Sequence, residues 1–205
     1  MLKKGLFLVL LTSLALIYQL NAQDDFSIGP RVGVNFSNVS HVDNSESLTG
    51  LALGLTSTYS LDESSGLTID VMFSHEGYQD HLNGVNDIKF TYMQIPIYYD
   101  LFFGEYGQTF RPKIYVGLEP GFLLHAKVND ETTEMAQFNT MNLAASGGLG
   151  FNVRAGSRIW INTDLRGFLG LTEIRDKDYD PVGEKRTLNN VQLSVGVAYG
   201  LAKYE

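Results

Sequence analysis

Three aspartates in the segment 172–187 have a spacing that could bind calcium. Asp176, Asp178 and Asp180 alternate like the first ligands of an EF-hand loop. Such a loop also needs glycine at its sixth position and glutamate at its twelfth, where this chain has Pro181 and Thr187. We therefore expect a solvated acidic loop, with weak calcium binding as the alternative.

Four histidines are the other potential metal ligands. They are His41, His75, His81 and His125, and no two of them have the i, i+4 spacing of a helical zinc motif. The chain has no cysteine, so thiolate ligands are excluded as well. We predict that the protein holds no metal ion and no cofactor.

Ser74, His75 and Glu76 are the residue types of a hydrolase with a serine nucleophile. On a strand, however, successive side chains point to opposite faces, so Ser74 and Glu76 would share a face that His75 does not. The sequence also lacks a G-x-S-x-G nucleophile elbow and a G-x-x-x-x-G-K-[ST] phosphate loop. We expect no enzymatic activity; a lipid-modifying enzyme that uses these three residues is the alternative.

Residues 1–22 have the layout of a secretory signal peptide. Lys3 and Lys4 give a basic start, and the apolar stretch that follows is short for a membrane-spanning helix. Cleavage after Ala22 would leave 23–205 as a single domain of ordinary size. A retained amino-terminal anchor is the alternative.

The exported chain is acidic. Of its 15 lysines and arginines two lie before residue 23, which leaves 13 basic against 23 acidic residues and a net charge near −10. Binding to phosphates requires clustered basic side chains, so we predict no nucleic-acid partner. Because the chain has no cysteine, packing and hydrogen bonds must hold the domain without disulfides.

Apolar and polar residues alternate with period two over eight long segments, which is typical of β-strands with one apolar face. The segments are 27–37, 49–61, 66–76, 90–101, 112–126, 140–154, 156–174 and 188–202. Each has at least 11 residues, whereas a strand of a globular protein averages about 5–6. A strand that crosses a membrane needs about 9–11 residues, so the lengths favour membrane strands.

The links between these segments are alternately long and short. The short links are 62–66, 102–110 and 155–157, and the long, polar links include 38–48, 126–139 and 172–187. Outer-membrane barrels have short periplasmic turns and longer outer loops. The sequence therefore predicts an all-β fold, an eight-stranded antiparallel up-and-down transmembrane β-barrel with four mostly acidic outer loops.

The polar rows of the strands carry charges of both signs. Their charged residues are Arg31, Asp70, Glu119, Arg154, Asp164 and Arg166. The opposite rows are almost free of charge, and eight such rows facing water would promote aggregation. We therefore predict that the apolar rows contact lipid and that the six charged residues form a structural polar network in the lumen.

Two further observations favour this orientation. Glycines are frequent in the polar rows, and an eight-stranded barrel is only wide enough for side chains to fill its interior. Asp164 and Arg166 lie roughly 7 Å apart along one strand face. Each is within reach of the other or of cross-strand partners, and pairing is expected because an unpaired buried charge costs on the order of several kcal/mol.

Four short motifs occur in order along the exported chain. They are Gly29, Gly33 and Asn35 in the first strand, Ile95-Pro96 in the fourth, Tyr115, Gly117 and Gly121 in the fifth, and Gly170 to Ile174 in the seventh. In this order and spacing they resemble the PorT-like outer membrane β-barrel proteins of Gram-negative bacteria. The resemblance implies a small barrel in contact with outer membrane lipid. The family's namesake is associated with secretion and gliding machinery, which implies other envelope or secretion proteins as partners.

We expect a non-enzymatic outer membrane protein with a structural or docking role in the cell envelope. Because side chains fill its lumen, the channel should be narrow or closed. Two alternatives stay open. One is a secretion or transport component of the outer membrane, and the other is a soluble periplasmic barrel that binds a ligand.

Overall fold

The computed structural model describes residues 26–40, 45–80, 86–105, 107–129, 131–132, 137–175 and 186–201. The expected signal peptide at 1–22 lies outside these residues. The aspartates of the possible calcium loop, Asp176, Asp178 and Asp180, lie outside them as well.

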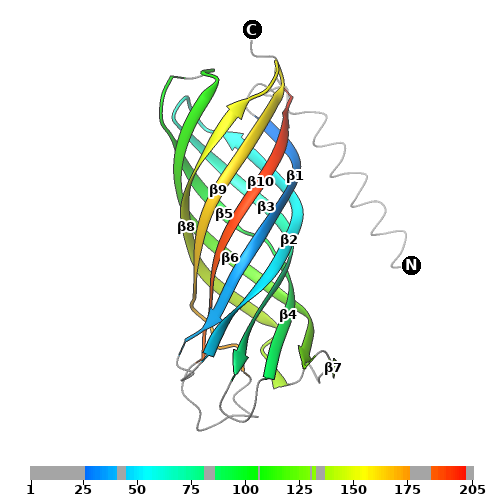
Figure 1. The fold of residues 1–205 in the computed structure, drawn as a ribbon. Coiled ribbons are helices and arrows are strands. Elements are labelled where there is room, and N and C mark those ends of the chain that lie inside the picture. The colour runs from blue at the N-terminus through cyan, green and yellow to red at the C-terminus, as the bar shows by residue number, and fades with distance from the viewer. Residues whose placement is uncertain are drawn as a thin grey trace, which may run out of the picture.

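Ten strands form a single antiparallel sheet (Figure 1). They are β1 (Phe26–Val39), β2 (Ser45–Ser60), β3 (Ser65–Asp80), β4 (Asn86–Gln94), β5 (Ile97–Phe102), β6 (Phe110–Val128), β7 (Glu131–Thr132), β8 (Met141–Arg154), β9 (Ile159–Gly170) and β10 (Leu188–Gly200). The short β7 pairs only with β6.

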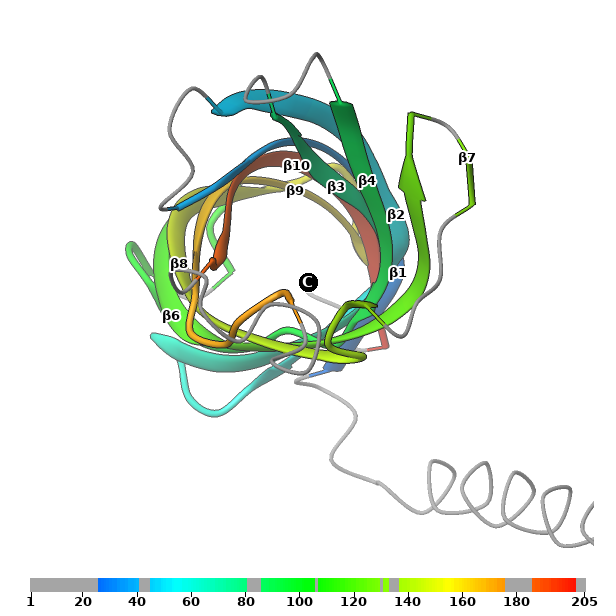
Figure 2. The ribbon, with the colours of Figure 1, turned by 90° about the horizontal axis from the view of Figure 1, so that it is seen from below.

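The sheet closes into a barrel because β1 pairs with β10. This pairing runs from Ser27 opposite Gly200 to Val39 opposite Leu188. β4 and β5 occupy one position between β3 and β6, so the ring has eight strand positions, seen end-on in Figure 2. The predicted eight-stranded antiparallel barrel is confirmed.

Pro96 interrupts the fourth strand position without shifting it. Both halves keep one register against β3, in which the partners are Met72–Gln94 and Ile69–Ile97. Proline has no N–H to donate, but its carbonyl still accepts a hydrogen bond of 3.0 Å from the Asp70 N–H. The predicted strand 90–101 is therefore one strand with a gap in its hydrogen-bond ladder.

Side chains alternate between the outer surface and the lumen along the strands. On β10, Leu193 and Val195 are 51% and 44% exposed, whereas Ser194 between them is buried. Exposed large apolar side chains occur at all eight strand positions, from Val32 on β1 to Val197 on β10. The apolar rows thus face outward. This contradicts the alternative of a soluble barrel, in which the apolar rows would fill the interior.

Glycines on the inward rows leave space for large lumen side chains. A Cβ atom at Gly117 would lie 2.8 Å from the ring of Tyr98, and one at Gly148 would lie 2.7 Å from the hydroxyl oxygen of Tyr115. Each Cβ would also overlap a backbone carbonyl of the adjacent strand. Glycine at these two positions therefore permits both the close approach of the strands and the filled lumen.

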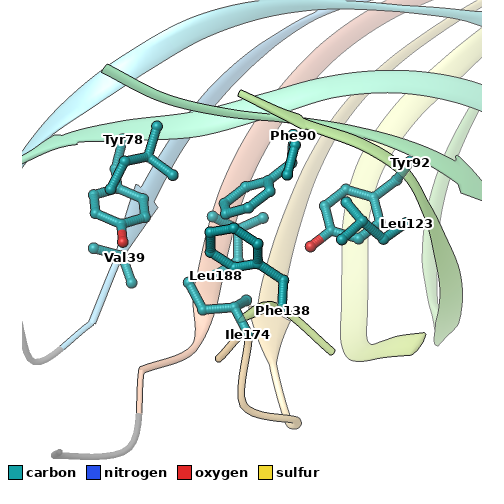
Figure 3. Close-up of a cluster of buried hydrophobic side chains, with 10 residues drawn as sticks. Val39, Tyr78, Phe90, Tyr92, Leu123, Phe138, Ile174 and Leu188 are labelled. Carbon is teal, nitrogen blue, oxygen red and sulfur yellow. The ribbon is translucent and has the colours of Figure 1, made fainter. Parts of the chain in front are cut away.

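An apolar cluster fills the barrel at the end where the longer loops lie (Figure 3). Its members are Val39, Tyr78, Ile88, Phe90, Tyr92, Leu123, Ala126, Phe138, Ile174 and Leu188. Phe138 and Ile174 come from segments between strands, and the Phe138 ring meets the Phe90 ring edge-on with centroids 5.0 Å apart. The lumen is therefore apolar at this end, although the inward rows are polar elsewhere.

Asp62 holds the hairpin turn between β2 and β3. Its carboxylate accepts hydrogen bonds from the backbone N–H groups of Ser64 and Ser65 at 2.7 and 2.8 Å, and from both serine hydroxyls. The hydrogen bond from the Ser65 hydroxyl, followed by those from Ser64, lowers the pKa of Asp62 to about 2. The ionised carboxylate is thus the form that organises this turn.

We expect an NMR titration of the Asp62 carboxyl group to give a pKa of about 2, below the ordinary value of 3.8. Because folding lowers this pKa, the stabilisation of the turn is complete above the ordinary value and is lost as the pH falls through about 2. Ser65→Ala should move the midpoint upward. A midpoint at the ordinary value in the unsubstituted protein would contradict this account of the turn.

Candidate functional site in the barrel lumen

Five of the six charged residues expected in the lumen lie buried on the inner face of the barrel. They are Arg31, Asp70, Glu119, Asp164 and Arg166. Arg154, the last residue of β8, is only half-buried and forms no ion pair with another described residue. Glu119 is buried but also forms no ion pair with another described residue, so ion pairs join only Arg31, Asp70, Asp164 and Arg166 of the predicted six.

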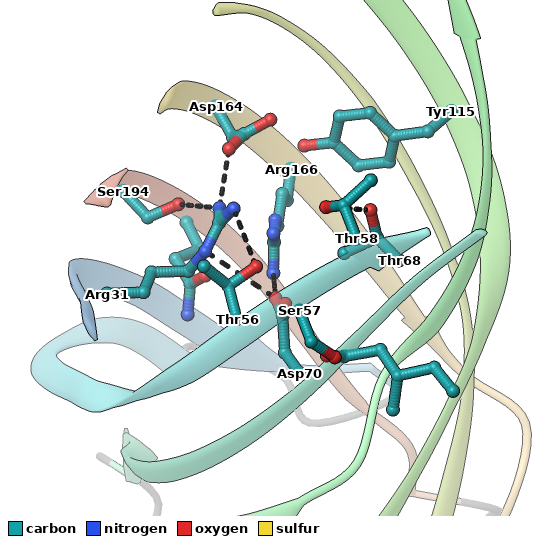
Figure 4. Close-up of polar contacts among 12 residues, drawn as sticks. Arg31, Thr56, Ser57, Thr58, Thr68, Asp70, Tyr115, Asp164, Arg166 and Ser194 are labelled. Carbon is teal, nitrogen blue, oxygen red and sulfur yellow. Dashed lines mark hydrogen bonds and ion pairs between the residues drawn. The ribbon is translucent and has the colours of Figure 1, made fainter. Parts of the chain in front are cut away.

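Arg31 is at the centre of ion pairs that cross the lumen (Figure 4). Its Nη1 lies 2.5 Å from Asp164 Oδ2, and its Nε lies 3.6 Å from Asp70 Oδ2. Arg31 also donates hydrogen bonds of 3.2 Å to the hydroxyls of Thr56 and Ser194. These contacts join β1 to β2, β3, β9 and β10.

Arg166 provides a second cation for Asp70. Its Nη1 lies 2.7 Å from Asp70 Oδ2. Its Cζ also lies 4.8 Å from the ring centroid of Tyr98 and 5.7 Å from that of Tyr115. Cation–π contacts are strongest when the cation is desolvated, and Arg166 is buried. The guanidinium group is thus fixed by one carboxylate and two aromatic rings.

Asp164 and Arg166 each bind a cross-strand partner rather than each other. Asp164 contacts Arg31 and also Lys113, whose Nζ lies 3.0 Å from Asp164 Oδ1. Arg166 contacts Asp70. Side chains two residues apart on a strand project side by side, whereas those of other strands converge toward the barrel axis, which brings the cross-strand partners closer.

Lys113 and Asp100 also belong to this network, although sequence reasoning did not include them. Both are buried, and Lys113 Nζ lies 3.4 Å from Asp100 Oδ1. A simple signal identifies them. Lys113 is the next inward position beyond Tyr115 on β6, and Asp100 is the next beyond Tyr98 on β5, so extending each row by one position would have found them.

Glu76 forms a second polar cluster, between the ion pairs and the apolar cluster. Its Oε1 accepts hydrogen bonds from Ser74 at 2.9 Å, Gln94 at 2.8 Å and Asn190 at 3.2 Å. Asn35 connects to this cluster by donating to Ser74 at 2.7 Å. The donors to Glu76 are all neutral side chains, which distinguishes this cluster from the ionic network.

The alternation of side chains along β3 separates the three residues of the possible hydrolase site. Ser74 and Glu76 point into the barrel, whereas His75 is exposed on the outer face, where its Nδ1 lies 3.4 Å from the Leu51 carbonyl oxygen. A histidine base must reach the serine hydroxyl in order to activate it. The barrel wall lies between them, so these residues do not form a catalytic triad.

The histidines are not assembled into a metal site where the structure shows them. His75 and His125 are exposed, and His41 and His81 lie outside the described residues. Among the described residues, no group of three or more histidine and acidic side chains is placed to hold a metal ion.

The described part of the chain also contains no helix that is long and apolar enough to cross a membrane.

Asp164→Asn tests the ionic part of the network. The amide keeps the size of the side chain but loses the charge that faces Arg31 and Lys113, so we expect the free energy of unfolding to fall by roughly 1.5–3 kcal/mol. Urea unfolding in detergent micelles measures the change. Asn189→Ala, near the long-loop end, serves as a control for general sensitivity, and equal losses in the two variants would argue against the network.

A comparison with known proteins assigns this chain to a family. Residues 19–176 match the family described as outer membrane protein beta-barrel domain. Neisserial surface protein A has a similar solved structure, with 13% identity, a TM-score of 0.54, and coverage of 85% of this chain and 96% of that one. E. coli outer membrane protein W also has a similar solved structure, with 13% identity, a TM-score of 0.51, and coverage of 86% of this chain and 97% of that one. No curated protein matches the sequence.

The two solved structures share the fold with this chain, and the family match covers most of its length. The closed ring, the outward apolar rows and the inward charges fit a barrel surrounded by lipid. The chain belongs to the outer membrane protein beta-barrel domain family and is a protein of the cell outer membrane.

Proposed function

We propose that this protein is a non-enzymatic barrel with a structural or docking role in the cell envelope, and that its lumen does not conduct. Export would use the signal peptide at 1–22 and deliver residues 23–205 to the outer membrane. The proposal rests chiefly on one observation, the packed side chains that cross the lumen.

Two successive layers of side chains lie across the path of a diffusing solute. The first is the ionic network around Arg31, Asp70, Asp164 and Arg166, whose side chains are at most 1% exposed. The second is the apolar cluster that includes Phe90 and Phe138. A diffusion pore has a water-filled interior, and a lumen filled in this way supports a structural role instead.

The long outer links supply a surface that could dock a partner. Each of the four has more acidic than basic residues in the sequence, as in 126–139, which contains Asp130, Glu131 and Glu134 against Lys127. A surface with one dominant sign of charge attracts oppositely charged partners over long distances. This charge favours an envelope protein with a basic surface as the partner.

Current recordings across planar lipid bilayers test the closed lumen. We expect no stepwise ion current from the inserted protein in concentrated KCl, and heat-modifiable gel mobility verifies that the sample is folded. A general diffusion porin recorded in the same bilayers is the positive control. Stable current steps from folded protein would contradict the proposal.

A secretion role is the second candidate, because the PorT-like proteins that this chain resembles take their name from a protein associated with secretion machinery. Deleting the gene and measuring the export of secreted proteins separates the two roles. Impaired export that the intact gene restores would support secretion. Normal export would leave the structural or docking role.

A lipid-hydrolysis assay on the purified barrel tests for an enzyme.

A further inference from the structure

We propose that the outer surface of the barrel binds a lipid phosphate at Lys127, near the long-loop end of β6. The ligand is a lipid of the outer leaflet whose head group carries a phosphate. This site goes beyond the structural or docking role proposed above, because it lies on the lipid-facing surface and needs neither the lumen nor a partner protein. It is argued from the order of side-chain types along three adjacent strands.

Basic side chains of β3, β4 and β6 gather on the outer surface at the long-loop end. Lys89 on β4 lies directly opposite Lys127 on β6, and His75 on β3 and His125 on β6 both pair with Thr91 of β4. Directly opposite residues project from the same face of a sheet. His75, His125 and Lys127 are exposed, and Lys89 is partly exposed. These four side chains form one basic patch, and no other lysine or arginine within the described strands lies at this end.

The basic patch borders the apolar surface of the same strands. Phe73, Met93 and Phe122 form the next row toward the middle of the barrel. Phe73 and Phe122 are 45% and 38% exposed, so this row contacts hydrocarbon in a barrel surrounded by lipid. The longer loops of outer-membrane barrels face outward from the cell. The basic patch therefore lies at the level of the head groups of the outer leaflet.

Lys127 is the cation that a lipid can reach without displacing a partner. Its side chain is exposed and forms no ion pair or hydrogen bond with any residue that the structure describes. Lys89 has contacts of its own, including Asp87 Oδ2 at 3.4 Å from its Nζ. Two like charges on directly opposite residues repel each other, and lysine binds phosphate through charge-assisted hydrogen bonds. A phosphate at Lys127 would relieve this repulsion while Lys89 keeps Asp87.

Acidic side chains lie on the other side of the basic patch, away from the hydrocarbon. Glu46 and Asp87 both pair with Gln79, which places them one row further out than the two lysines. Glu131 on β7 pairs with the residue after Lys127, so it projects from the opposite face of the sheet. The order along the strands is thus apolar, basic and then acidic. Positive charge is confined to the depth at which lipid phosphates lie, which favours a lipid over a free anion.

Titration with dioctanoylphosphatidic acid tests the site. The folded full-length protein is held in uncharged maltoside micelles, and the amide NMR signals of residues 125–128 are followed. We expect saturable shifts of these signals. Dioctanoylphosphatidylcholine has the same chains but carries a positive choline group on its phosphate, and inorganic phosphate has no chains. Both should bind more weakly than the phosphatidic acid.

Lys127→Gln should weaken binding of the phosphatidic acid roughly fivefold, the contribution of one lysine near a charged lipid surface. Lys127→Arg keeps the charge and should retain the affinity. Asp87→Asn removes a negative charge beside the patch and should tighten binding, a gain that loss of structure cannot produce. Arg158→Gln removes a basic side chain at the short-turn rim and should leave binding unchanged, which makes it the matched control.

Heat-modifiable mobility verifies that each variant is folded. The absence of saturable shifts would overturn the proposal, as would unchanged affinity in folded Lys127→Gln. Equal affinity for phosphatidylcholine would show that the chains alone are bound, and equal affinity for inorganic phosphate would show that the site does not select a lipid. The same weakening in Lys127→Gln and Arg158→Gln would reveal a response to net charge only. Each of these results contradicts a lipid phosphate site at Lys127.

Discussion

Arg166→Met is expected to lower the free energy of unfolding by about 3–5 kcal/mol, because it removes one partner of a buried ion pair. Asp70 would keep only the Nε of Arg31, 3.6 Å away, as a nearby cation. Tyr98 and Tyr115 would lose the guanidinium group that lies over their rings. Urea unfolding in detergent micelles, followed by intrinsic fluorescence, measures this loss.

Arg158→Met is the matched control for this experiment. Arg158 also contacts a tyrosine, with its Nη1 donating to the Tyr199 hydroxyl at 3.0 Å, but it lies at the solvent-exposed rim. Its replacement should cost at most about 1 kcal/mol. Adding Asp70→Asn to Arg166→Met should recover part of the lost stability, since the unpaired charge is then removed. Equal losses at Arg158 and Arg166 would show that burial of the network does not matter.

Leu55→Arg is expected to destabilise the barrel by about 2–4 kcal/mol, the cost of placing arginine on the lipid face near the bilayer midplane. Leu55 is 54% exposed and lies near the middle of an exposed apolar row that runs from Leu51 to Leu61. In a barrel surrounded by lipid, the Leu55 side chain contacts the hydrocarbon of the bilayer. Reversible unfolding by guanidinium in lipid vesicles gives the cost.

Leu61→Arg distinguishes membrane depth from simple exposure. Leu61 is exposed to nearly the same degree as Leu55, at 52%, but it lies at the short-turn end of the row. Arginine there should cost only about 0–1 kcal/mol, because its guanidinium reaches the interface. The same cost at both positions would contradict the placement of the bilayer around β2.

The sequence was sufficient to predict the barrel because period two is a direct consequence of strand geometry. Each strand repeats one simple rule, in which alternate residues meet lipid or lumen, as with Val195 and Ser194 on β10. Even Pro96 does not break this rule, since both sides of the gap keep one register against β3. The repeated pattern therefore predicted the strands, the side of the sheet on which each residue lies, and the closed barrel.

The partners inside the lumen were less predictable. The row rule assigned Arg31, Asp70, Asp164 and Arg166 to the inner face, but it contains no information on which strands face each other across the axis. The bond from Arg31 to Asp164 joins residues 133 positions apart. Such contacts depend on the tilt and stagger of the closed ring, which cannot be read from single strands.

The apolar cluster was not predicted at all, for a different physical reason. Phe138 and Ile174 lie in irregular segments, held by backbone contacts such as the hydrogen bond from the Asn139 N–H to the Ile174 carbonyl. Irregular segments follow no period, so no repeating pattern indicates that they turn inward. The row rule places Phe90 on the inner face with Tyr92, but it does not indicate that Phe138 and Ile174 pack in the same cluster.

The pairing of β1 with β10 also constrains how the molecule is assembled. Without residues 188–200 the sheet would have two unpaired edges, one of them on β1. Unpaired edges invite association with other chains, and pairing between distant parts of a chain is slow. A chain that lacks its last strand therefore cannot close the ring, so the barrel is complete in the membrane only when β10 pairs with β1.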